Sequence, residues 1–191
     1  MKALKNSPAQ PIVDLPGQIV HHALTQSASY RDLETKRRAY LNLIAIDMTV
    51  EWLDAIDWAN VATATQPMHQ NWEAVNGTAL ALKEKSLIVI PDNRLDSEEL
   101  VVPEYWTVPS QHQGDYFLFV AIDPNENRFR FVGYTTHKAL ITEGTYGLNE
   151  KGYRLAADQI TSDIAVFSVV RQVSPNEVTR YGDQVLTDRA S

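Results

Sequence analysis

The feature that most constrains this chain is the stretch from Asp32 to Trp58, in which apolar residues recur at helical spacing. The positions that follow this spacing are Leu33, Tyr40, Leu41, Ile44, Met48, Trp52, Ala55 and Ile56. A second apolar set widens the same face: Leu43, Ile46 and Val50. A helix that is apolar around most of its circumference has to be covered on most sides. The sequence therefore predicts a long buried helix, with Ser29 as its N-cap and Asp32 as a weak capping-box partner.

Length, charge and cysteine content limit the classes of protein to which the chain can belong. Its 191 residues suffice for one domain, and 17 basic against 24 acidic residues give a net charge of −7, which argues against nucleic acid as a partner. The absence of cysteine excludes disulfides and thiol chemistry and fits the cytoplasm. No apolar run reaches the roughly 18 residues of a membrane span. We expect a cytoplasmic protein without a membrane partner.

Beyond the long helix the apolar period changes from helical to alternating, which is typical of strands. A hairpin is predicted over residues 78–90, with a second strand buried on both faces. A central strand follows at 116–122, and a turn connects it to a returning strand at 128–134. A helix then begins after Thr136 and ends near Gly144, and a last strand is predicted at 164–170.

These elements predict one α+β domain and two terminal extensions. A short helix over residues 15–28 and the long buried helix pack on a mostly antiparallel sheet of about five strands, with a further helix after the central hairpin. The domain is expected to span residues 15–173. Residues 1–14 are predicted to form a mobile arm and residues 174–191 a polar tail.

Signatures of catalysis are missing from the sequence. The eight glycines form no nucleotide-binding loop, no Gly-x-Ser-x-Gly elbow occurs, and the five histidines are scattered. The densest acidic cluster outside the helices is Asp92, Asp96, Glu98 and Glu99, which lacks the central glycine of a calcium loop and is interpreted as a solvated loop. We therefore predict no catalytic residue, no metal site and no cofactor.

One strand face carries the candidate binding residues. Alternation places Arg128 and Arg130 on the same face as Tyr134, next to His137 at the start of the following helix. Two arginines on one face repel each other unless an acid lies between them, and Asp123 or Glu126 could serve. If no acid reaches them, this face combines residue types that are enriched at interface hot spots. The candidate partner is then another protein or a second copy of the chain.

Three segments resemble an uncharacterised cyanobacterial domain-of-unknown-function family. They are the run Arg38–Ile46 with its Tyr-Leu-Asn triplet, the segment Gln70-Asn71-Trp72, and the run Val102–Trp106 with its Val-Pro-x-x-Trp pattern. The resemblance covers residues 15–133. It implies no activity, because the family has none assigned.

The order of elements is also similar to that of the PD-(D/E)xK nuclease-like fold. This resemblance implies a metal held by carboxylates and a lysine that orients water, with Glu73, Glu84 and Lys85 as the residues nearest the pattern. The pattern has one residue between its Glu and its Lys, whereas Glu84 and Lys85 are adjacent in this chain. The resemblance therefore implies that the catalytic site is lost. We expect a non-catalytic domain that acts by binding another protein; the alternative is a metal-dependent nuclease-like enzyme acting on DNA or RNA.

Overall fold

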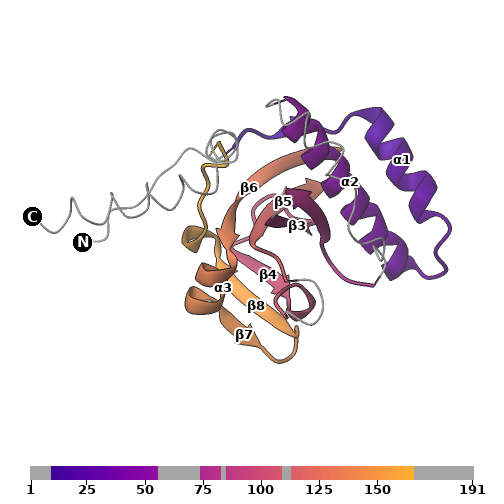
Figure 1. Ribbon diagram of the computed structural model, residues 1–191. Coiled ribbons are helices and arrows are strands. Elements are labelled where there is room, and N and C mark those ends of the chain that lie inside the picture. Colours follow the sequence, from indigo (N-terminus) through magenta and orange to yellow (C-terminus); the bar gives the residue numbers. More distant parts are fainter. Residues whose placement is uncertain (1–9, 56–73, 83–84, 109–112, 166–191) are drawn as a thin grey trace, which may run out of the picture.

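The computed structural model describes residues 10–55, 74–82, 85–108 and 113–165, which form three layers (Figure 1). Helices α1 (Gly17–Ser27) and α2 (Leu33–Ala55) form the first layer. A five-stranded sheet forms the second layer, and a three-stranded sheet with helix α3 (His137–Glu143) forms the third. Among the described residues, no helix is long and apolar enough to cross a membrane.

The five-stranded sheet has the order β1-β6-β5-β3-β2. Its strands are β1 (Val13–Asp14), β2 (Thr78–Leu82), β3 (Lys85–Asp92), β5 (Tyr116–Asp123) and β6 (Arg128–Thr136). Strands β3 and β5 run parallel, whereas the other neighbouring pairs are antiparallel. The predicted fold class is therefore confirmed, including the hairpin, the central strand and the helix after the central hairpin.

The three-stranded sheet was not predicted. It has the order β4-β8-β7 and consists of β4 (Glu99–Pro103), β7 (Thr145–Gly147) and β8 (Gly152–Ala156). Strands of three to five residues are too short to show a clear period in the sequence. The strand predicted from residue 164 is not seen in its described part, because Ile164 and Ala165 lie in a turn, and residues 166–170 lie outside the described chain.

Between Ala39 and Leu53, helix α2 is buried around most of its circumference, as its sequence predicts, whereas Leu33 and Ala55 of the predicted apolar stripe are exposed. Its buried positions are Ala39, Leu41, Asn42, Leu43, Ile44, Ala45, Ile46, Met48, Thr49 and Leu53. The predicted N-cap is wrong: the Asp32 carboxylate accepts a hydrogen bond from the Thr35 N–H at 2.8 Å, whereas the Ser29 hydroxyl donates to the Gln26 carbonyl. Asp32 caps the helix because the Thr35 N–H, three residues on, is an orphan donor of the first turn.

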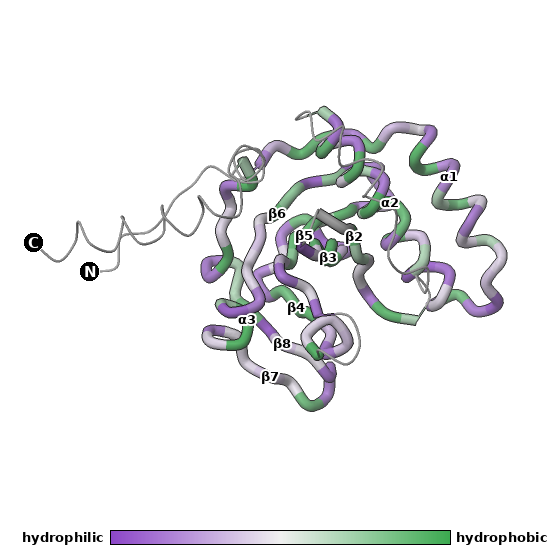
Figure 2. Tube along the Cα trace, in the orientation of Figure 1, coloured by the Kyte–Doolittle hydropathy of each residue, from purple (hydrophilic) through white to green (hydrophobic). Residues whose placement is uncertain are grey.

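Two apolar cores lie on the two faces of the large sheet, and β3 and β5 in its middle carry long apolar runs, whereas β6 is mixed (Figure 2). The first core packs α1 and α2 against residues such as Leu87 and Leu118. The second core packs the small sheet and α3 against residues such as Phe117 and Phe119. Because β3 and β5 face a core on each side, they are the continuous apolar strands of the sequence.

The N-terminal boundary of the described domain includes part of the predicted arm. Val13 and Asp14 pair with Phe129 and Arg128 of β6, and the Gln10 side chain donates a hydrogen bond to the Ser162 carbonyl. Residues 1–9 and 174–191 lie outside the described chain, so the mobility of the arm and of the tail stays a prediction.

Candidate functional site

The predicted binding face of β6 is interrupted by a β-bulge. Gly133 pairs with Phe119 and Phe131 pairs with Val120, which leaves Val132 as an extra residue. After the bulge, Tyr134 packs in the first core with Phe131, whereas Val132 packs in the second. The prediction that Tyr134 shares a face with Arg128 and Arg130 is therefore wrong, because one inserted residue reverses the alternation.

Both arginines already have partners in the fold. Arg128 forms an ion pair of 3.0 Å with Glu126, one of the two acids that the sequence indicated. Arg130 donates a hydrogen bond to the Leu95 carbonyl in the loop after β3. These contacts favour a role of the two arginines within the fold over a role in binding a partner. They hold the β5–β6 turn and the loop after β3.

His137 is placed by its backbone rather than by its imidazole. It begins α3, and its N–H donates to the Asp115 carbonyl at 3.0 Å. Its ring lies 6.3 Å from the Phe117 ring, and its Nδ1 is buried without a partner among the described residues. The four predicted binding residues are thus spread over both faces of β6 and the start of α3.

Of the three residues of the nuclease-like reading, the structure describes only one. Glu73 and Glu84 lie outside the described residues. The Lys85 ammonium lies 3.1 Å from Asp115, which also accepts hydrogen bonds from the Ser86 N–H and hydroxyl. Within the described ranges, no three His, Asp or Glu side chains gather as metal ligands.

The Asp115 cluster makes stability depend on pH in acid. Burial raises the pKa of the Asp115 carboxyl, but hydrogen bonds from Ser86 and Lys85 outweigh it and set the pKa below its ordinary value of 3.8. A carboxylate with a lowered folded pKa stabilises the fold above its unfolded pKa, and this contribution is lost as pH falls through the folded pKa. Asp115→Asn should therefore lower the free energy of unfolding near neutral pH, with the difference from wild type vanishing in acid.

We expect a difference below about 1 kcal/mol, because the side chain is partly exposed. Urea denaturation at pH 7 and at pH 3 or below measures it. Asp158→Asn is the control, since this exposed carboxylate has no ion pair among the described residues. A difference that grows on acidification would contradict the assignment.

A cleft of about 410 Å³ lies between the first half of α2, the end of β3 and β4. Its floor is apolar and comes from four different elements: Leu41, Ile90, Leu100 and Phe119. None of these residues is more than 8% exposed, so the floor consists of the outer surface of the buried cores. The cleft opens where β3 extends beyond its neighbour: β2 pairs only as far as Val89.

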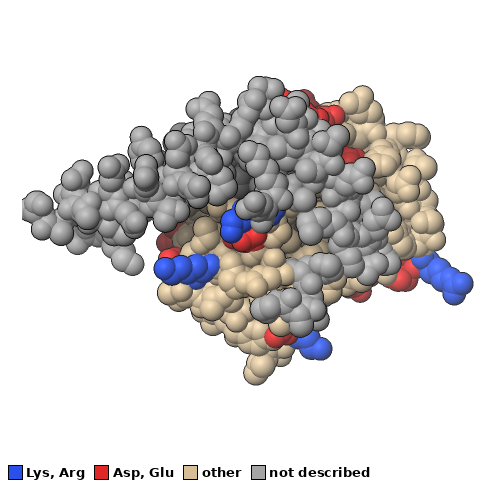
Figure 3. Space-filling model, viewed as in Figure 1, with Lys and Arg blue, Asp and Glu red and all other residues tan. Residues whose placement is uncertain are grey.

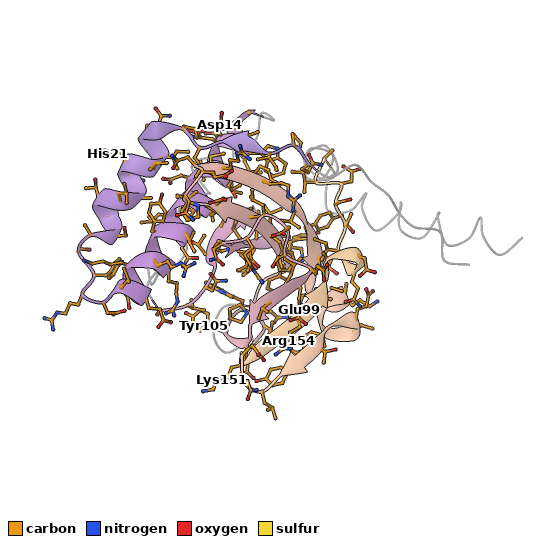
Figure 4. The ribbon with its side chains drawn as sticks, turned by 180° about the vertical axis from the view of Figure 1, so that it is seen from behind. Asp14, His21, Glu99, Tyr105, Lys151 and Arg154 are labelled. Carbon is orange, nitrogen blue, oxygen red and sulfur yellow. The ribbon has the colours of Figure 1, made fainter. Side chains whose placement is uncertain are left out.

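Charged side chains of both signs surround the cleft: Glu34, Arg37, Arg38, Asp92, Arg94 and Glu99. Most of them are already paired. Arg38 contacts Glu34 at 2.7 Å, Arg94 contacts Asp92 at 3.5 Å, and Glu99 lies 3.8 Å from Arg154 on the neighbouring strand (Figure 4). On the face seen in Figure 3, basic side chains likewise lie in separate places, each near acidic ones. The rim is therefore a mixture of charges.

The strand edge inside the cleft is closed to further pairing. Pro91 has no N–H, and its carbonyl accepts a hydrogen bond from the Asn76 side chain at 3.1 Å. A proline on an edge strand is one of the ways by which proteins prevent strand addition. Whatever enters this cleft is contacted by side chains.

The wall that carries Asn76 is held by residues of two segments that carry the family resemblance. Asn42 of the Tyr-Leu-Asn triplet donates to the Val75 carbonyl at 2.9 Å and accepts from the Gly77 N–H at 2.8 Å. Trp106 of the Val-Pro-x-x-Trp pattern donates from Nε1 to the Asn76 carbonyl at 2.8 Å. These residues, 64 positions apart in the chain, fix one short segment from both sides.

The sequence did not point to this cleft. The acids after β3 were interpreted as a solvated loop, and no sequence pattern connects them with the arginines near the start of the long helix. The sequence does not show that these arginines and acids lie close together, because their proximity depends on α2 crossing the end of β3.

The comparisons place the chain in a family. Residues 13–191 match the family described as "Protein of unknown function (DUF1822)". Comparison with curated proteins and with solved structures finds no match. The family match confirms a family of unknown function, while the cyanobacterial origin and the nuclease-like layout stay predictions. The chain therefore belongs to the DUF1822 family.

Proposed function

We propose that the protein is a non-catalytic cytoplasmic domain that acts by binding another protein. The observation that carries this proposal is the cleft between α2, β3 and β4. Its apolar floor inside a polar, charged rim is the anatomy of a protein-interaction site, in which a desolvated centre is surrounded by solvated groups. This location replaces the β6 face, whose arginines are engaged within the fold.

The state of the cleft carboxylates favours binding over acid–base chemistry. Glu34, Asp92 and Glu99 each lie next to an arginine. Asp92 also accepts a hydrogen bond from the Ser97 hydroxyl at 2.6 Å. A carboxylate that is held by an arginine in this way is fixed in position, which suits a recognition surface.

Site-specific photo-crosslinking in the native host tests the proposal. Asn93 is exposed and lines the cleft, so a photoreactive phenylalanine analogue at this position should crosslink one defined protein. The same analogue at Gln26, an exposed residue of α1 outside the cleft lining, is the matched control. We expect a discrete adduct from position 93 that is absent from position 26.

The pattern of adducts decides the outcome. Excess unlabelled wild-type protein should abolish the adduct from position 93, because both compete for the same partner. Equal adducts from both positions, or none from position 93 in cells that contain the folded protein, would contradict protein binding at the cleft.

A further inference from the structure

We infer that the cleft recognises an acidic side chain of its protein partner, with Arg37 as the group that contacts the carboxylate. This inference rests on the proposed function and adds the chemistry of the recognised segment. It follows from the way in which charged groups pair around the cleft, from its floor and from its closed strand edge.

Arg37 is the unmatched charge of the cleft. The three carboxylates of the rim pair with Arg38, Arg94 and Arg154. Arg37 lines the same cleft, is exposed, and forms no ion pair or hydrogen bond among the described residues. Since each carboxylate of the rim lies next to another arginine, Arg37 is the guanidinium at the opening that can pair with an incoming carboxylate.

A single unpaired guanidinium among rim carboxylates favours a carboxylate over a phosphate as its ligand. A phosphate group carries a charge of about −1.5 to −2 near neutral pH. In this cleft it would stand close to Glu34, Asp92 and Glu99, and their repulsion would oppose it. A side-chain carboxylate carries a single charge and can accept two parallel hydrogen bonds from one guanidinium.

The floor indicates what accompanies the acid. Leu41, Ile90, Leu100 and Phe119 form an apolar base beside the charged rim. Val101, a half-buried residue of β4, extends this surface toward solvent. A partner segment that places an apolar side chain on the floor and an acidic one at Arg37 would complement both parts of the cleft.

Recognition through side chains follows from the edge of β3. The missing N–H of Pro91 and the bond from Asn76 to its carbonyl remove the groups that a partner strand would need. The segment therefore does not add to the sheet, and its specificity comes from the acid and its apolar neighbour.

Selection of peptides on the full-length protein tests the inference. A random dodecapeptide library displayed on phage is selected against the wild-type chain, and the enriched peptide is synthesised with its acid intact, with Asp or Glu replaced by Asn or Gln, and with phosphoserine at that position. Affinities are measured by calorimetry for wild type, Arg37→Gln and Arg31→Gln. Arg31 is the matched control because it is exposed and outside the cleft lining.

We expect enriched peptides to share one acid beside an apolar residue and to lose about tenfold in affinity with Arg37→Gln, as for a charge-assisted hydrogen bond at an exposed site. Arg31→Gln should leave the affinity unchanged. Peptides without a shared acid, equal binding to Arg37→Gln, or tighter binding of the phosphoserine peptide would each overturn the inference. If crosslinking from position 93 succeeds in those cases, protein binding at the cleft survives while acid recognition does not.

Discussion

Replacing Trp106 by alanine should lower the free energy of unfolding by about 4 kcal/mol, within the range known for buried aromatic residues. The side chain is fully buried and packs in the core between the large sheet and the small one. Its removal leaves a cavity in that core, and the Asn76 carbonyl loses the hydrogen bond from Nε1. Guanidinium denaturation followed by far-ultraviolet circular dichroism measures the change without depending on tryptophan fluorescence.

Trp106→Phe separates the two contributions of this residue. Phenylalanine keeps most of the ring volume but donates no hydrogen bond, so we expect a smaller loss of about 1–2 kcal/mol. The neighbouring half-buried ring of Tyr105 packs edge-on against Trp106, with ring centroids 4.8 Å apart. A loss below about 1 kcal/mol for Trp106→Ala would show that the second core does not depend on this side chain.

Replacing Asn42 by alanine should lower the free energy of unfolding by about 3 kcal/mol, because buried groups left without hydrogen bonds cost roughly 1–3 kcal/mol each. Asn42 is fully buried and bonds both the Val75 carbonyl and the Gly77 N–H. Gly77 has φ +107°, and a Cβ there would lie 2.8 Å from Trp106 Nε1, so the segment has little freedom to find other partners. Urea denaturation of both proteins gives the difference.

Asn93→Ala is the matched control for this substitution. Asn93 is an exposed asparagine on the same cleft, and its replacement should change stability by less than about 0.5 kcal/mol. The double variant Asn42→Ala with Trp106→Ala should cost less than the sum of the single changes, since both residues hold residues 75–77. Full additivity would contradict their joint action on this segment.

The sequence alone was sufficient to predict those elements whose burial is visible in the spacing of their own apolar residues. The apolar stripes of α2 and the continuous apolar runs of β3 and β5 predicted the elements and most of their buried positions, although Leu33 of the predicted stripe is exposed and Asn42 is buried. In these cases the period of a single segment reports how many of its sides are covered.

The face to which each side chain of β6 points could not be predicted from the alternation of residues in the sequence alone. A single extra residue at Val132 moved Tyr134 to the opposite face from the one predicted. Gly133 marks the bulge, since a Cβ there would lie 2.5 Å from the Thr161 carbonyl, but one glycine in a strand does not reveal which residue is inserted. Next to the bulge, Tyr134 pairs with Thr161 in an isolated antiparallel bridge, a contact between residues that are distant in the chain.

The set of residues that line the cleft depends on tertiary structure alone. Its lining runs from Glu34 on α2 to Phe119 on β5, and no local pattern links residues so far apart in the chain. Local sequence determines which residues become helical, extended or buried, because those properties depend on near neighbours. Which charges meet across a cleft depends on the crossing of α2 over the end of β3 and on the unpredicted sheet that carries β4, and both are set by long-range packing of the two cores.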